Sequence, residues 1–305
     1  MLSRIPGIVW LLGTLLVFFS AFGTRFASAP NVVNIGTQSA ILLLLALPMT
    51  LIIMTEGLDL SMGAVLGLSG VVLSILLVKG FALPVAFAAA LAVGTAFGVA
   101  NGVLVVALGM PPFVATLGML GVAEGIALVL TDGQSVVAIG STLSGIYSRQ
   151  WAGIPFSIFV AVTAYAAFHL LLYHTRIGTY VFAIGGNREA LNLAGVPANR
   201  YHVLIYALGG LMAGAGAFLL TGRMSGGHPT AAIGMEFDAI VAVIVGGTRL
   251  ERGDGWLPGS VLGVLTVGVL KNGLNVMAVP SSLQIASIGL LVIVALLIDS
   301  IRGRT

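Results

Sequence analysis

Two pairs of carboxylates, each directly before an apolar stretch, mark two places where ion or substrate chemistry could occur. Glu56 and Asp59 precede one apolar stretch, and Glu236 and Asp238 precede another. A charged side chain at the bilayer centre costs about 2.5–3.5 kcal/mol on insertion scales, so each carboxylate must face a cavity, a partner or an interface. Such groups can bind a proton, a sodium ion or a substrate, or they can cap the positive end of a helix. For Asp59 and Asp238 the capping role is favoured, and substrate contact is the alternative.

The two acidic sites lie in stretches that resemble each other. Residues 58–67 resemble residues 237–246, and Asn101 and Asn272 each precede a glycine by 17 residues. In the expected order of spans, the first copy begins on the cytoplasmic side and the second on the outside. This pattern predicts an inverted repeat, which is typical of transporters with alternating access. For the two asparagines, an interhelical hydrogen bond is favoured over substrate contact.

A third polar stretch, residues 184–197, predicts a short helix that is exposed to water between two membrane spans. Asn187 is a good N-cap, and Glu189 lies in the first turn, near the positive end of the helix dipole. Gly195 can supply a left-handed C-terminal residue, and Pro197 prevents continuation. A helix of about two turns is too short to be stable alone in water. We therefore expect its own protein or a partner to hold it.

The elements that must position these groups are membrane helices. Of 305 residues, 58% are hydrophobic and 8% are charged, whereas a soluble domain carries about 25% charge. The composition predicts an all-α polytopic membrane protein in contact with the lipid bilayer. The net charge of +3 gives no reason to expect a nucleic-acid partner, and the absence of cysteine excludes disulfides.

We expect about ten transmembrane helices in a single domain, residues 1–305, with repeat halves 35–131 and 203–300. Residues 27–29 resemble a signal-peptide cleavage site, but an uncleaved first span is favoured because the rest is polytopic. Eight arginines, Arg4, Arg252 and Arg304 among them, fall on the cytoplasmic side, which places both termini there. Residues 131–155 form a polar loop with a short interfacial helix, and residues 174–202 form a cytoplasmic loop. The expected spans are 5–22, 35–55, 64–78, 83–108, 113–130, 156–173, 203–222, 239–247 (too short to cross alone), 257–279 and 283–298.

Glycines four residues apart can let helix backbones approach closely in lipid. Such pairs are Gly63/Gly67, Gly94/Gly98, Gly121/Gly125, Gly210/Gly214 and Gly259/Gly263.

Motifs of catalysis are missing from the sequence. It contains no Gly-x-x-x-x-Gly-Lys-Ser/Thr phosphate loop and no Gly-x-Ser-x-Gly elbow, and its four histidines lack metal-ligand spacing. We therefore expect no catalytic residue, no metal site and no enzymatic activity.

Residues 56–64 resemble the Gly-Ile-Asp-Leu-Ser-Val-Gly-Ala stretch of ribose-type sugar permeases of bacterial ABC importers. Residues 101–118, 175–196 and 244–248 match the same family, so that the resemblance covers about residues 40–300 in order. Glu56 is a departure, because a glycine is commoner at that position.

The resemblance implies that two permease subunits form the pathway, as a homodimer or a heterodimer, in the bacterial inner membrane. Two ATPase subunits would dock from the cytoplasm and a periplasmic sugar-binding protein would deliver the substrate. The permease itself would bind no cofactor, since ATP and Mg belong to the ATPase. The docking element of ABC importers carries Glu-Ala-Ala-x-x-x-Gly, which residues 189–195 match except at Leu191. The ATPase-coupling residues would be Gly186, Asn187, Arg188, Glu189, Ala190, Leu191 and Gly195.

A second set of polar or aromatic residues would line the translocation pathway or serve as structural polar groups. These residues are Glu56, Asp59, Ser61, Asn101, Phe113, Thr116, Glu236, Asp238 and Asn272. The leading hypothesis is therefore the permease of an ATP-driven monosaccharide importer. One alternative is an ABC permease for another solute, such as a branched-chain amino acid or an autoinducer-like furanose. The other is an ion-coupled secondary transporter that uses Asp59, Glu236 and Asp238.

Overall fold

A computed structural model describes residues 7–137, 139–249 and 253–302. Arg4, Arg252 and Arg304, which contributed to the topology prediction, lie outside the described residues. The described chain is mainly helical, and helices suit a membrane environment because their intrahelical hydrogen bonds satisfy the backbone groups in lipid. The helices are α1 (Gly7–Phe22), α2 (Ala29–Met54), α3 (Met62–Val78), α4 (Leu83–Gly102) with a π-helical turn (Val103–Ala107), α5 (Pro112–Thr131), α6 (Ser141–Tyr147), α7 (Phe156–His174), α8 (Arg176–Leu193), α9 (Ala198–Met224), α10 (Met235–Val245), α11 (Leu257–Val276) and α12 (Ser281–Arg302).

Six helices of the described chain are long and apolar enough to cross a membrane: α2, α4 with its π-helical turn, α5, α7, α9 and α11. Shorter apolar helices are α1, α3 and the segment Ser281–Leu291 of α12. The expected count of about ten spans is therefore not confirmed, although each expected span coincides with a helix. Residues 31–34, which lie between the first two expected spans, belong to α2, which begins with a proline in its first turn.

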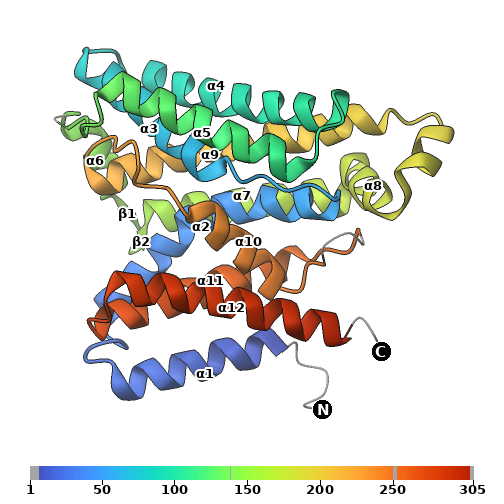
Figure 1. The fold of residues 1–305 in the computed structure, drawn as a ribbon. Helices are drawn as coiled ribbons and strands as arrows, with labels where there is room; N and C mark the ends of the chain where they lie inside the picture. Colours follow the sequence, from blue (N-terminus) through green and yellow to red (C-terminus); the bar gives the residue numbers. More distant parts are fainter. Residues whose placement is uncertain (1–6, 138, 250–252, 303–305) are drawn as a thin grey trace.

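Two helices, α2 and α9, form the centre of the bundle (Figure 1). From Ser39 to Met54 every residue of α2 is buried. The pairs that follow α2 and α9 in the chain are exchanged between them: α3 and α4 pack against α9, whereas α10 and α11 pack against α2. Within each pair, the two helices also pack against each other.

Close backbone contacts between helices occur where the glycine pairs predict them. A side chain on Gly94 would meet the carbonyl oxygen of Gly210, and one on Gly98 would meet that of Tyr206, so α4 and α9 cross with their backbones in contact. Gly259 and Gly263 of α11 lie in the same way against α10. Gly121 and Gly125 make no such contact within the described chain, since none of its atoms lies within 4 Å of the position that a side chain would take.

The two ends of the bundle carry different structures (Figure 1). One end carries α6 and a hairpin of β1 (Gln150–Trp151) and β2 (Ile154–Pro155), and the other carries α8. A helix was expected within residues 131–155, and it is present as α6. Trp151, at the hairpin, is 52% exposed.

Candidate functional site

The polar stretch that follows α7 folds as a bent helix. Within α8, Asn187 has φ −162° and ψ 94°, so the helix is interrupted there and starts again at Arg188. The side-chain oxygen of Asn187 accepts a hydrogen bond from the backbone N–H of Ala190 at 2.8 Å. This is the N-cap geometry expected from the sequence. We call the second part, residues 188–193, the short helix.

The short helix also ends as expected. Gly195 has φ +81°, a left-handed conformation that glycine adopts without strain. Its N–H donates to the carbonyl of Asn192 at 3.0 Å, and the N–H of Val196 donates to the carbonyl of Leu191 at 3.3 Å. These two bonds form a Schellman motif, which satisfies carbonyls that the helix end would leave unpaired.

One side of the short helix is held by the start of α9. The guanidinium of Arg188 donates to the side-chain oxygen of Asn199 at 2.7 Å, and the backbone N–H of Ala198 donates to that of Asn192 at 3.2 Å. The other side is open: Glu189 is exposed, and Leu193 is 85% exposed. The arrangement presents one charge and one apolar side chain on a preformed helix, which suits a groove on another protein.

The break between α2 and α3 gathers four of the predicted polar residues. Asp59 accepts hydrogen bonds from the backbone N–H of Ser61 at 2.9 Å, the Ser61 hydroxyl at 2.7 Å and the Asn101 amide at 3.2 Å. The hydroxyl of Thr116 accepts from the backbone N–H of Leu60 at 3.1 Å. Asp59 is buried and bound on all sides, and it ties the start of α3 to α4. The carboxylate of Asp59 thus binds the residue before α3 and the side chain of Asn101, and it does not cap α3 as expected, because Ser61 is the N-cap residue of that helix and no side chain caps it there.

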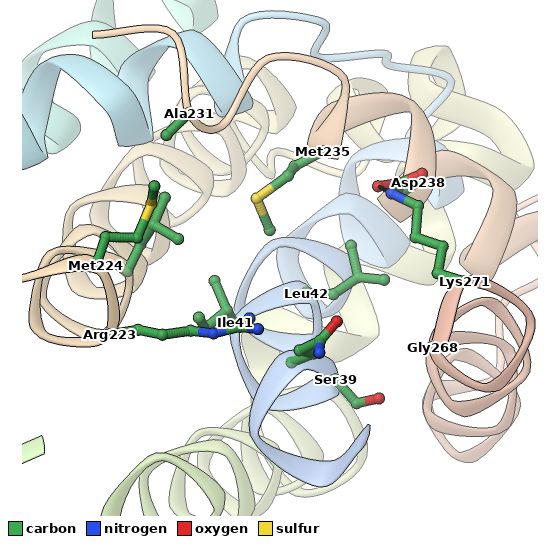
Figure 2. Close-up of a pocket in the computed structure, with 12 residues that line it drawn as sticks. Ser39, Ile41, Leu42, Arg223, Met224, Ala231, Met235, Asp238, Gly268 and Lys271 are labelled. Atoms are coloured by element: carbon green, nitrogen blue, oxygen red, sulfur yellow. Dashed lines mark hydrogen bonds and ion pairs between the residues drawn. The ribbon is translucent and has the colours of Figure 1, made fainter. Parts of the chain in front are cut away.

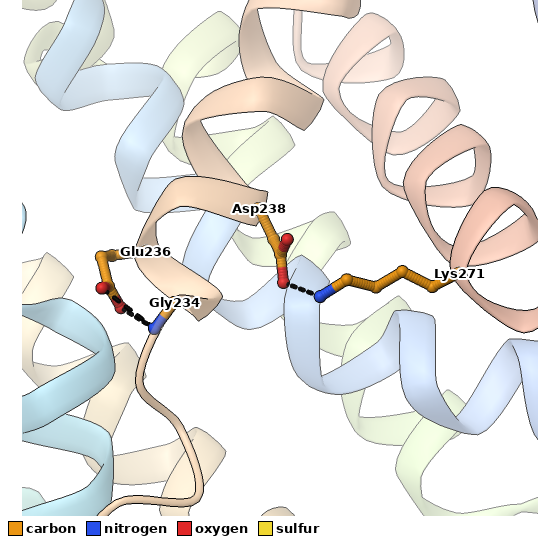
Figure 3. Close-up of polar contacts among 4 residues, drawn as sticks. All are labelled: Gly234, Glu236, Asp238 and Lys271. Atoms are coloured by element: carbon orange, nitrogen blue, oxygen red, sulfur yellow. Dashed lines mark hydrogen bonds and ion pairs between the residues drawn. The ribbon is translucent and has the colours of Figure 1, made fainter. Parts of the chain in front are cut away.

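The second acidic site is built differently (Figure 3). The backbone N–H of Gly234 donates one bifurcated hydrogen bond to the two carboxylate oxygens of Glu236, at 3.0 and 3.1 Å, and this carboxylate packs against Gly63 of α3. Asp238 forms an ion pair with Lys271 of α11. The pairing of Lys271 with Asp238 was not predicted from the sequence. The place of Lys271 beside Asn272, the counterpart of Asn101, was the signal that could have identified it as the partner of Asp238.

Three predicted site residues lie elsewhere. Asn272 exchanges two side-chain hydrogen bonds with Asn31 of α2, at 2.8 and 3.0 Å, as favoured for an interhelical asparagine. Phe113 is exposed at the start of α5. Glu56 is exposed in the α2–α3 break with φ +60°. Glycine, the residue that the resemblance implies at this position, adopts that left-handed backbone without strain.

A cavity of about 390 Å³ opens between α2, α9, α10 and α11 (Figure 2). Asp238 is the one predicted site residue among the described residues that line it. The buried Asp59 cluster is not part of this lining. Of the two acidic sites, only the second therefore has a carboxylate, that of Asp238, at the cavity.

Sequence reasoning missed one further acid, Glu124. It lies in the middle of α5, is half-buried, and has no hydrogen bond or ion pair to the residues that the structure describes. The neighbouring Gly121 and Gly125 face open space on the same helix. A carboxylate within an apolar span should have stood out from hydropathy alone, because such residues are rare in membrane helices unless they are functional.

Comparison with known proteins gives consistent matches over nearly the whole chain. The family model described as "Branched-chain amino acid transport system / permease component" matches residues 31–298. The ribose import permease protein of Escherichia coli K12 is 37% identical over 94% of this chain and 90% of its own length. The ribose import permease protein of Bacillus subtilis is 36% identical over 93% of this chain and 89% of its own length. The D-allose transport system permease protein of Escherichia coli K12 is 30% identical over 98% of this chain and 92% of its own length.

A solved ABC transporter of the metal-chelate type, in an inward-facing conformation, has a similar fold. The TM-score is 0.52 at 14% identity, over 98% of this chain and 99% of the solved chain. At this identity the likeness concerns the fold alone.

Proposed function

Because this chain belongs to the branched-chain amino acid transport system / permease component family, we propose that it is the membrane subunit of an ATP-driven importer for a monosaccharide. The observation that carries the proposal is its similarity, at 30–37% identity over almost the full length, to permeases named for ribose and D-allose. Its relatives are transport permeases, and the chain is therefore a transport subunit and not an enzyme.

In the proposed assembly, ATP hydrolysis, substrate delivery and membrane transport are carried out by different chains. ATP and Mg are bound by partner ATPase subunits, and a periplasmic sugar-binding protein delivers the substrate. A second permease subunit, identical or related, completes the pathway. The chain lies in the bacterial inner membrane with both termini on the cytoplasmic side.

The short helix is the proposed contact with the ATPase. Its capped ends make it rigid, and α9 holds it on one side only. Glu189, Ala190 and Leu191 would enter a groove of the ATPase, with Gly186, Asn187, Arg188 and Gly195 shaping the approach. Any displacement of the short helix would act directly on α9 through Arg188 and Asn199.

The halves 35–131 and 203–300 form the proposed inverted repeat. The exchange of helix pairs between α2 and α9 supports it. In the first half, α3 and α4 pack against α9, and in the second half, α10 and α11 pack against α2. The two halves therefore use equivalent packing partners. Closure of the ATPase pair would move one half against the other and alternate access to the pathway.

The predicted polar residues divide between two proposed roles. Asp59, Ser61, Asn101 and Thr116 would hold the break before α3 in place, and Asn272 would join α11 to α2. Glu236 and Asp238 would fix the start of α10, whereas Glu56, Phe113 and Glu124 are exposed or lack partners within the described chain and would face the pathway.

Reconstitution tests the proposal. The purified permease, its ATPase and its binding protein are placed in liposomes, and uptake of labelled ribose and allose is measured with and without internal ATP. We expect uptake that needs both ATP and the binding protein. Uptake driven by a proton or sodium gradient alone would refute it, and uptake of leucine in place of the sugars would refute the substrate class.

A further inference from the structure

The cavity between α2, α9, α10 and α11 has a charge distribution that the proposed transport function does not use (Figure 2). Among the described residues that line it, Arg223 and Lys271 are the cations and Asp238 is the acid. Lys271 is already bound to Asp238. The guanidinium of Arg223 therefore adds one positive charge for which no described residue of the lining supplies a carboxylate.

The rest of the lining is amphipathic. Ile41, Leu42, Leu220 and Met235 form an apolar wall. Ser39 is 6% exposed, and its hydroxyl has no hydrogen-bond partner among the described residues. A ligand that fits this lining combines a single negative charge with apolar chains.

The cavity reaches the surface near one end of the bundle. Arg223 and Met224 are the last two residues of α9, and both are exposed. The adjacent Gly222 lies against Tyr147 of α6, so the opening is at the end that carries α6 and the hairpin, away from α8. The ends of membrane-spanning helices lie at the headgroup region of the bilayer, where the phosphodiesters of phospholipids are found.

We propose that this cavity binds a phospholipid, with its phosphodiester against Arg223 and its acyl chains along the apolar wall. A phosphodiester carries one negative charge, which matches the single unmatched cation. The planar guanidinium can donate two parallel hydrogen bonds to phosphate oxygens. A neutral sugar would leave both the charge of Arg223 and the apolar wall unused.

The test uses the assembled transporter in detergent after removal of its lipids. Native mass spectrometry measures the binding of dioleoyl phosphatidylglycerol to the wild type, to Arg223→Gln and to Arg149→Gln, in which an exposed arginine beside the hairpin is neutralised as a matched control. We expect Arg223→Gln to bind this lipid about tenfold more weakly, the effect of losing one charge-assisted contact. Arg149→Gln should bind as the wild type does. Arg223→Lys should bind more tightly than Arg223→Gln but less tightly than the wild type, because lysine keeps the charge and loses the two parallel hydrogen bonds.

Two further probes separate the parts of the ligand. Dioleoylglycerol has the chains without the phosphate, and its binding should not depend on Arg223. Inorganic phosphate has the charge without the chains and should not displace the lipid at millimolar concentration. Equal lipid binding by the wild type and Arg223→Gln, an equal loss in Arg149→Gln, or displacement by inorganic phosphate would each overturn the proposal. Thermal unfolding of each variant identifies any that fail to fold, and Arg223→Lys then provides the comparison.

Discussion

The side-chain oxygen of Asn187 lies 2.8 Å from the backbone nitrogen of Ala190 and closes the first turn of the short helix. This bond fixes where the exposed helix begins, directly after a stretch of α8 with buried residues. The position of the proposed ATPase contact therefore depends on one side chain.

Asn187→Ala should loosen the short helix by about 1 kcal/mol, because the N–H of Ala190 loses its partner. We expect weaker stimulation of the ATPase by the loaded binding protein, and less sugar taken up for each ATP hydrolysed. Both are measured in liposomes. Asn187→Asp keeps an N-cap oxygen and should behave as the wild type, and equal losses in the two variants would contradict the capping explanation.

Gly63→Ala should disrupt the packing of α3 against Glu236. A side chain at Gly63 would lie 2.0 Å from a carboxylate oxygen of Glu236 and 2.6 Å from the carbonyl oxygen of Ala232. Overpacking of this kind costs about 1–3 kcal/mol, so the thermal unfolding temperature should fall. Gly121→Ala is the matched control, since the same change on α5 meets open space and should leave that temperature nearly unchanged. Equal effects of the two changes would refute the contact.

Glu56→Gly should stabilise the protein by up to about 1 kcal/mol, because glycine adopts the left-handed backbone without the strain that other residues carry. Thermal unfolding in detergent measures it. Glu56→Ala removes the same carboxylate but keeps the strain, and should give no such gain. A lower unfolding temperature for Glu56→Gly than for Glu56→Ala would contradict the claim that the left-handed backbone at residue 56 is strained.

Glu124→Leu should reduce sugar uptake several-fold while leaving membrane insertion intact, since leucine costs less than glutamate within an apolar span. Uptake in liposomes at equal protein content gives the result. Glu124→Gln keeps hydrogen-bonding capacity and should retain more transport than Glu124→Leu. If transport by Glu124→Leu equals that of the wild type, the residue does not face the pathway.

The two ends of the short helix could be predicted from the sequence, because the residues that form them interact with near neighbours in the chain. Its N-cap, its left-handed glycine and its following proline each act within a few residues, and all three lie where they were expected. The helices themselves followed from apolar stretches, although hydropathy and length support six long spans where about ten were expected.

Contacts between distant residues were harder to foresee. Asn31 and Asn272 are 241 positions apart, and Asn31 lies before the span that was expected to begin at residue 35. Lys271 pairs with Asp238 only because α10 and α11 pack together. Hydropathy alone marks Lys271 as a topology charge, and it does not show that Glu124 lacks a partner.

The most direct test of coupling is the number of sugar molecules taken up per ATP hydrolysed, in liposomes that contain the Glu189→Arg permease with its ATPase and binding protein. We predict that the variant stays in the membrane and that ATP hydrolysis continues, but that the ratio falls at least about tenfold, because a reversed charge opposes docking of the short helix. Glu189→Gln should lie between the variant and the wild type. An unchanged ratio for Glu189→Arg would contradict the claim that this helix transmits the work of the ATPase.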